Sequence, residues 1–120
     1  MYSLLYHIAF MIKGNKEVID NNDIITFIKT VFEQISKKFD VDIIDYEVGK
    51  NYIHILISSK PTLDIPLYLS VLKGHSSRYI RKNFNLKEIG EDNFWDDHYF
   101  IATTGNVTMD AIMEYIRKNS

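Results

Sequence analysis

One alternating apolar stretch constrains the fold more than any other part of the chain. From Lys50 to Ser58 the sequence is rich in β-branched and apolar residues, and the Ser-Ser-Lys-Pro that ends it is typical of a strand terminus. Because the side chains of a strand alternate between its two faces, its three isoleucines share one face, which we assign to the core. The opposite face carries Tyr52, His54 and Leu56. A histidine on such a strand is most often a half-buried residue with a hydrogen-bond partner, and the alternative is a functional residue.

The neighbouring segments predict the rest of the architecture. Residues 41–48 form a second strand, and Gly49-Lys50-Asn51 turns it into the first as an antiparallel hairpin. Apolar periodicity predicts strands over 2–12 and 99–104 and helices over 23–39, from 64 or 65 to 84, and over 109–118. Asn21-Asn22-Asp23 supplies the cap of the first helix. The order β-α-β-β-α-β-α predicts a single α+β domain over residues 1–120, with an antiparallel sheet and helices on one face, ferredoxin-like.

Composition limits the classes of function. The 120 residues include no cysteine, so disulfides and thiolate metal sites are excluded. No apolar run reaches the roughly 18 residues of a membrane span, and the N-terminus has no basic signal-peptide start, so we expect a cytoplasmic protein with no membrane partner. The net charge of -2 is a weak signal for nucleic-acid binding, which normally draws on a basic surface. A local basic patch on a neutral protein could still bind DNA.

Charged and aromatic residues outside the hairpin each allow two interpretations. Arg78, Arg81 and Lys82 cluster on the second predicted helix with Lys73 before them, either as a solvated face or as contacts to phosphate. In the acidic segment 85–98, which we predict to be a loop, the pair Phe94-Trp95 either anchors the loop to the core or stacks on a base. The adjacent residues Asp97 and His98 point different ways on an extended chain, which argues against a metal site there.

His7 lies inside the first predicted strand. Its side chain is either satisfied within the sheet or a direct contact to DNA.

Five stretches in order resemble the single-tyrosine HUH transposases of small bacterial insertion sequences. They span nearly the whole chain, and no single one is very specific. The stretches are Tyr6-His7-Ile8, Asn51-Tyr52-Ile53-His54, Leu72-Lys73-Gly74-His75-Ser76-Ser77-Arg78, Phe94-Trp95 with Tyr99 to Gly105, and Tyr115-Ile116 with Asn119. The third resembles the family's Lys-Gly-x-Ser-Ser-Arg helix, and the last its Tyr-Ile-x-x-Gln.

The resemblance implies a function and a site. Members of this family cut and rejoin single-stranded DNA through a 5′-phosphotyrosine link, in a reaction that depends on Mg²⁺ or Mn²⁺. The resemblance therefore implies single-stranded DNA, including hairpin ends, as the partner of this chain. Carried over by position, Tyr115 would be the nucleophile, with His54 and Asn119 as metal ligands. The resemblance also implies a homodimer, in which the tyrosine helix of one subunit acts at the histidine strand of the other. By the same resemblance, the basic residues of the second helix, including Lys73, would contact the DNA.

Two departures from the family pattern fall on the metal site. Tyr52 stands where the first histidine of the HUH pair is expected, and Asn119 stands where the family has glutamine. A neutral phenol is a poorer ligand than imidazole, and asparagine is one methylene shorter. We therefore expect weakened catalysis, with little or no phosphotyrosine adduct. The alternative is a catalytically inactive relative that acts only as a nucleic-acid or protein binding module.

Overall fold

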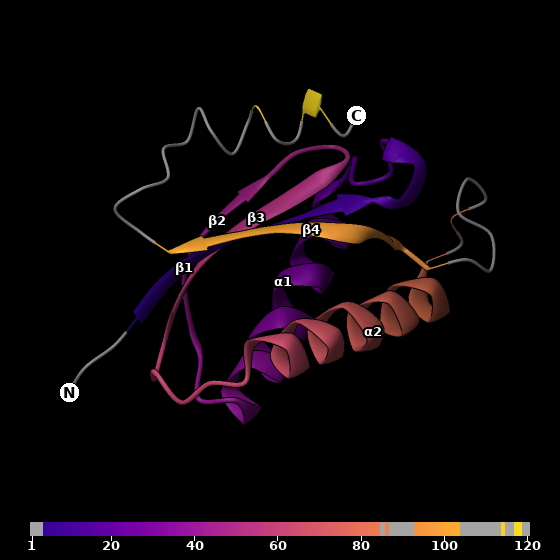
Figure 1. Ribbon diagram of the computed structural model, residues 1–120. Coiled ribbons are helices and arrows are strands. Elements are labelled where there is room, and N and C mark those ends of the chain that lie inside the picture. Colours follow the sequence, from indigo (N-terminus) through magenta and orange to yellow (C-terminus); the bar gives the residue numbers. More distant parts are fainter. Residues whose placement is uncertain (1–3, 85, 87–92, 104–113, 115–116, 119–120) are drawn as a thin grey trace.

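The computed structural model describes residues 4–84, 86, 93–103, 114 and 117–118. Within them, one antiparallel sheet lies against two helices, as Figure 1 shows. The elements are, in chain order, β1 (Leu4–Ile12), a short 3-10 turn η1 (Lys13–Asn15), α1 (Asn22–Lys38), β2 (Asp42–Val48), β3 (Tyr52–Ser59), α2 (Ile65–Asn83) and β4 (Trp95–Thr103). The α+β, ferredoxin-like architecture predicted from the sequence is confirmed.

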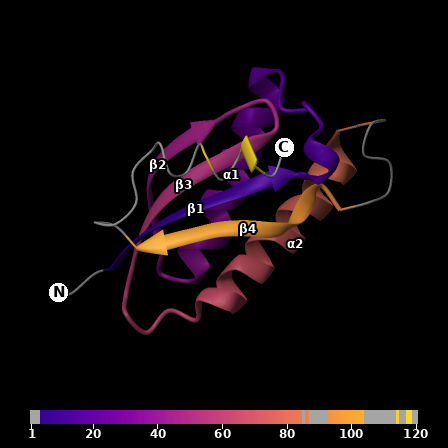
Figure 2. The same ribbon diagram turned by 45° about the horizontal axis from the view of Figure 1, so that its top comes forward.

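The strands lie in the order β2-β3-β1-β4, and every neighbouring pair is antiparallel (Figure 2). The predicted hairpin is therefore present, with β2 at one edge of the sheet and the histidine strand β3 inside it. On the other side of β3 lies β1, where Ala9 is the partner of His54 and Met11 is the partner of Tyr52. Together with the β2–β3 register, this pairing places His7 of β1, His54 of β3 and Glu47 of β2 on one face of the sheet.

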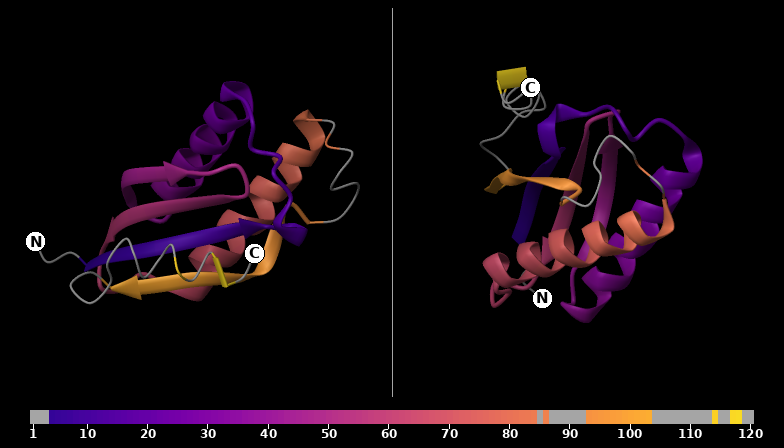
Figure 3. Two further views of the ribbon diagram at one scale, coloured as in Figure 1. Left: turned by 90° about the horizontal axis from the view of Figure 1, so that it is seen from above. Right: turned by 90° about the vertical axis from the view of Figure 1, so that its right-hand side faces the viewer.

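Both described helices cover the opposite face, as the two views of Figure 3 make clear. The three isoleucines of β3 point toward these helices and are fully buried, as the alternation predicts. Burying each one contributes about 1.5–3 kcal/mol relative to leaving it in water. The first helix begins as expected, because the Asn21 side chain accepts a hydrogen bond from the Ile24 N–H at 3.0 Å. The core therefore lies between the sheet and these two helices, and the face that carries His54 is turned away from both of them.

The loop prediction for residues 95–98 is wrong, because β4 begins at Trp95 rather than at Tyr99. Trp95 pairs with Ile12 across a register shift in β1, and its side chain is buried. The acidic residues that follow concealed this strand, since β4 is an edge strand of the sheet, where charged side chains can reach water.

The final predicted helix, 109–118, lies mostly outside the described residues. Glu114, Arg117 and Lys118 are described and have helical backbone, and Arg117 donates a hydrogen bond to Glu114 at 2.8 Å. Tyr115 and Asn119, the predicted nucleophile and amide ligand, are outside the described part of the chain.

Candidate functional site

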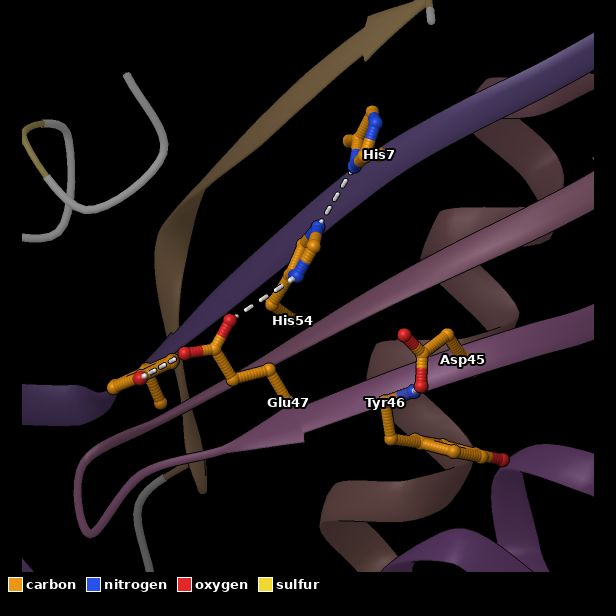
Figure 4. A network of polar contacts seen from close by, with 6 residues as sticks. His7, Asp45, Tyr46, Glu47 and His54 are labelled. Carbon is orange, nitrogen blue, oxygen red and sulfur yellow. Dashed lines mark hydrogen bonds and ion pairs between the residues drawn. The ribbon is translucent and has the colours of Figure 1, made fainter. Parts of the chain in front are cut away.

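Two histidines from neighbouring strands meet on the sheet face that is turned away from α1 and α2. His54 comes from β3 and His7 from β1, two positions along from Ala9, the strand partner of His54. The His7 Nδ1 atom lies 3.0 Å from His54 Nε2, and the two rings are nearly parallel, with 8° between their planes (Figure 4). Only 5% of His54 is exposed, while His7 is half-buried. The structure therefore joins two residues that the sequence interpretation treated separately.

Glu47 stands behind His54 on the third strand of this face. It is the strand partner of His54 across the hairpin, and its Oε2 atom lies 3.9 Å from His54 Nδ1 (Figure 4). This separation is longer than a hydrogen bond, but the carboxylate favours a proton on the ring nitrogen that faces it. The other ring nitrogen, Nε2, is then left with a lone pair that points toward His7.

Burial keeps the His54 imidazole neutral. Desolvation, with the neighbouring His7 as a second cause, lowers the pKa of His54, and the carboxylates of Glu47 and Asp45 only partly offset this. A neutral imidazole is the form that binds metal ions.

Tyr52 occupies the position of the missing histidine, and its hydroxyl points toward the Glu47 carboxylate. Its hydroxyl donates to Glu47 Oε1 at 3.4 Å. The phenol ring lies directly against the backbone of Gly49, where an added Cβ would come within 2.1 Å of the ring atom Cε1. Burial, and then Glu47, raises the pKa of Tyr52, so the phenol stays protonated at neutral pH. A protonated phenol that donates to a carboxylate does not replace an imidazole as a ligand.

The donor set suits a cation of intermediate softness. Within the described residues, no group of three or more His, Cys, Asp or Glu side chains could hold a metal ion. The pair of His7 and His54 supplies two nitrogen ligands, and water or a phosphate oxygen would have to complete the coordination. His98 contributes nothing here, because it is exposed and its Nδ1 lies 3.3 Å from Asp96.

The basic residues of α2 separate into two groups. Arg78 and Lys82 are exposed one turn apart near the end of the helix, and the half-buried Arg81 lies between them in sequence. Its Nε atom is 3.4 Å from the Ser77 carbonyl. These three residues (the α2 basic cluster) are near enough to one another to contact consecutive phosphates.

Lys73 is used inside the protein. Its ammonium donates to the carbonyl oxygens of Asp96 and Asp97, at 2.6 and 3.2 Å. Burial lowers its pKa, with the two aspartates acting in the opposite direction. It also lines a pocket of about 100 Å³ between α2 and the start of β4. Lys73 therefore ties α2 to β4 and stands apart from the α2 basic cluster.

The two serines of the same motif also serve the packing of α2 on β4. Ser76 Oγ accepts the indole N–H of Trp95 at 2.8 Å, and Ser77 Oγ accepts the backbone N–H of Phe94 at 2.8 Å. Both aromatic side chains are buried, so the prediction that they anchor this segment to the core is confirmed. Their burial excludes the alternative in which they stack on a base.

A sequence profile described as "Transposase IS200 like" matches residues 1–119. The chain belongs to this IS200-like transposase family. A relative, the ISDra2 transposase TnpA of Deinococcus radiodurans, is 29% identical over 118 residues, covering 97% of this chain and 84% of its own length. The transposase of the insertion sequence element IS200 from Salmonella typhimurium is 25% identical over 114 residues, covering 93% of this chain and 74% of its own.

Solved structures agree on the fold of this IS200-like transposase. A crystal structure of a transposase from Deinococcus radiodurans superposes with a TM-score of 0.88 at 26% identity, covering 98% of this chain and 92% of that one. A REP-associated tyrosine transposase, solved bound to a REP hairpin, superposes with a TM-score of 0.65 at 9% identity. It covers 96% of this chain and 61% of its own. At that identity the second match supports the fold alone. No helix in the described part of the chain is long and apolar enough to cross a membrane.

Sequence reasoning about the site of this IS200-like transposase omitted Glu47 and did not place His7 beside His54. Glu47 could have been found from the hairpin, since pairing residues 41–48 with 50–58 places its acidic side chain opposite His54. His7 carried a weaker signal, because the sequence does not say which strand lies beside β3. The non-local pairing of β1 with β3 brings His7 to His54, and no local pattern encodes it.

Proposed function

We propose that this protein is a single-strand DNA transposase that cleaves and rejoins DNA through a 5′-phosphotyrosine link. Membership of the IS200-like family supports the reaction class. The observation that carries the proposal is the imidazole pair of His7 and His54 on the sheet face where the resemblance expects a metal site. This pair compensates in part for the missing histidine at position 52.

The proposed chemistry is a reversible phosphoryl transfer. The Tyr115 hydroxyl oxygen attacks the scissile phosphorus, the bond from phosphorus to the 3′ oxygen breaks, and the phenolic proton is lost as the leaving oxygen gains one. The product strands are a free 3′ hydroxyl and a 5′ phosphate joined to Tyr115. A 3′ hydroxyl of a second strand reverses the step and releases the tyrosine. The bond energy is conserved, so rejoining needs no nucleotide cofactor.

Mg²⁺ or Mn²⁺, when bound, would polarise the scissile phosphate and stabilise the charge that develops on it. His54 and His7 would hold the cation from the sheet, with the amide oxygen of Asn119 as a third ligand. Glu47 orients the His54 ring, while burial keeps its imidazole neutral. Imidazole nitrogen favours Mn²⁺ over Mg²⁺, so Mn²⁺ should support the reaction better.

The α2 basic cluster would hold the DNA strand. Arg78 and Lys82 are exposed and positively charged on a protein whose net charge is -2, so they form a local patch rather than a general basic field. We propose hairpin ends of single-stranded DNA as the substrate form, as the family resemblance implies; a tyrosine transposase of similar fold has been solved bound to a REP hairpin. We propose that the protein acts as a homodimer, with the tyrosine helix of one subunit working at the sheet of its partner.

A second candidate is an inactive relative that only binds nucleic acid or a protein partner. The contact of the Tyr52 hydroxyl with Glu47 favours it, because that contact gives the phenol a structural role at a ligand position. Losing a residue that only hydrogen-bonds to a metal ligand lowers metal affinity or activity by roughly 10- to 100-fold. Replacing a ligand itself should lower them more. On the active proposal, the unmodified protein should therefore form adduct slowly rather than not at all.

A covalent-adduct gel separates the two candidates. The probe is single-stranded DNA that spans both flanks of the protein's own gene, labelled at its 3′ end and incubated with Mn²⁺. The active proposal predicts a slowly formed labelled band that survives denaturation and is absent in Tyr115→Phe. It also predicts faster formation in Tyr52→His, which places a second imidazole on the strand face of His54, about 7 Å away at Cα. No adduct in the unmodified protein or in Tyr52→His would favour the inactive binding module.

A further inference from the structure

The separation of the two facing imidazole nitrogens matches that of two ligands on one cation. His7 Nδ1 and His54 Nε2 are 3.0 Å apart. Two ligand atoms about 2.1 Å from a cation are about 3.0 Å apart when they subtend a right angle, and about 3.4 Å apart at the tetrahedral angle. The two nitrogens thus have the spacing of neighbouring octahedral ligands. To share a cation, they must lose the proton between them, and the rings must turn so that both lone pairs meet at the cation.

We infer that His7 and His54 together bind one divalent transition-metal cation, so that β1 supplies the imidazole that Tyr52 does not. The use of this site in strand transfer rests on the proposed function, whereas cation binding itself needs no DNA. In the HUH pattern both histidine ligands lie on one strand. Here they lie on two neighbouring strands, and the pairing of β1 with β3 holds them together.

The surroundings of the pair support a ligand role. Glu47 lies 3.9 Å from the His54 nitrogen that faces away from His7, on the side from which a carboxylate can orient a metal-binding histidine. His54 is buried, while the half-buried His7 leaves the pair reachable from solvent. A purely structural contact at this place would need no pair of titratable rings, since the next two residues of β1 on this face, Ala9 and Met11, are buried and apolar.

The two nitrogens also determine which cation fits. Imidazole suits Mn²⁺, Co²⁺ and Zn²⁺, whereas Mg²⁺ prefers oxygen ligands. The predicted order of affinity therefore places Mn²⁺ below Co²⁺ and Zn²⁺, with Mg²⁺ weakest of all.

Calorimetric titration of the DNA-free protein with Co²⁺ and with Mn²⁺ tests the site. His7→Ala and His54→Ala should each lower the affinity by more than about 100-fold, because losing a ligand costs more than the roughly 10- to 100-fold of losing a residue that only supports a ligand. Tyr52→Phe should keep the affinity within about twofold, and so should the matched histidine control His98→Ala. Circular dichroism on each variant shows whether it folds. Loss of affinity in Tyr52→Phe with none in His7→Ala would overturn the inference.

A measurement on the unmodified protein avoids any dependence on variant folding. Proton–nitrogen correlation spectra resolve the imidazoles of the four histidines. Substoichiometric Mn²⁺ should broaden the signals of His7 and His54 and spare those of His75 and His98. Equal broadening of all four, or none, would overturn the site. A positive titration with a negative adduct gel would retain this site and reject the proposed function, so the two failures are distinguishable.

Discussion

The indole N–H of Trp95 donates a hydrogen bond to the Ser76 hydroxyl at 2.8 Å, and both side chains are buried. Ser76 in turn donates to the Leu72 carbonyl one turn earlier on α2; its O–H therefore points away from the indole. The contact fixes the first residue of β4 against the middle of α2. Part of the motif that resembles the family's Lys-Gly-x-Ser-Ser-Arg helix therefore holds the fold together.

Ser76→Ala should destabilise the protein by about 1–3 kcal/mol, because it leaves the buried indole N–H without an acceptor. Denaturant unfolding followed by tryptophan fluorescence measures this. The matched control is Ser70→Ala, an exposed serine on the same helix, which should change the free energy of unfolding by less than about 0.5 kcal/mol. Equal effects of the two substitutions would show that the Trp95 contact contributes nothing.

The lowered pKa of His54 predicts how stability depends on pH. An unfolded histidine titrates near pH 6.5, and the folded His54 titrates below that. Below about pH 6.5 the unfolded chain therefore binds a proton that the folded chain does not, and stability falls by up to about 1.4 kcal/mol per pH unit. Above pH 6.5 this contribution is fully present. The charged or titratable groups that face His54 are His7, Glu47, Asp45 and Tyr52.

Unfolding free energies at pH 7.5 and 5.5, with chelator present, check this prediction. The loss on acidification should be smaller in His54→Gln than in the unmodified protein. His98→Gln, which removes an exposed histidine, should keep the full loss. If His54→Gln and the unmodified protein lose the same stability, the burial of a neutral His54 is not what makes the protein acid-sensitive.

The sequence predicted the fold well because the fold rests on local signals. Alternation along β3, the Gly49 turn and the Asn21 cap each specify an element from a few adjacent residues, and the structure confirms all three. The site was harder, because it depends on which strands pair. His54 was identified within its strand, but the contact with His7 follows from the β1 and β3 register, which joins residues 47 positions apart. Lys73 illustrates the reverse, since its position on a basic helix did not reveal its carbonyl partners on β4.

Replacing Arg78, Arg81 and Lys82 with alanine should weaken single-strand DNA binding and flatten its salt dependence. Each lost phosphate contact removes about 0.7 from the slope of log affinity against log salt, so three remove about 2. Fluorescence anisotropy with an oligonucleotide, between low and moderate salt, measures both quantities. The matched control removes three positive charges from α1, namely Lys29, Lys37 and Lys38. An unchanged affinity and slope in the α2 variant, or the same loss in the control, would refute the assignment of this surface.

The protein should be a homodimer whose interface includes strand edges. Within the described residues, β2 and β4 each pair on one side only, and Ile44 on β2 is 54% exposed. Light scattering at high micromolar concentration should give twice the chain mass of 14.1 kDa. Ile44→Lys should shift the mass toward the monomer if the β2 edge is used, and should leave a dimer if β4 is used instead. A monomer mass for the unmodified protein would remove the homodimer from the account.

Anomalous diffraction from crystals soaked in Mn²⁺ tests the central claim most directly, because it locates the cation without reference to activity. The account predicts a single anomalous peak on the sheet face turned away from α1 and α2, about 2.1–2.3 Å from both His7 Nδ1 and His54 Nε2, with Glu47 still behind the His54 ring. His7→Ala crystals should lose this peak under the same soak. A peak bound by the Tyr52 oxygen and His54, or no peak within reach of His54, would contradict the account.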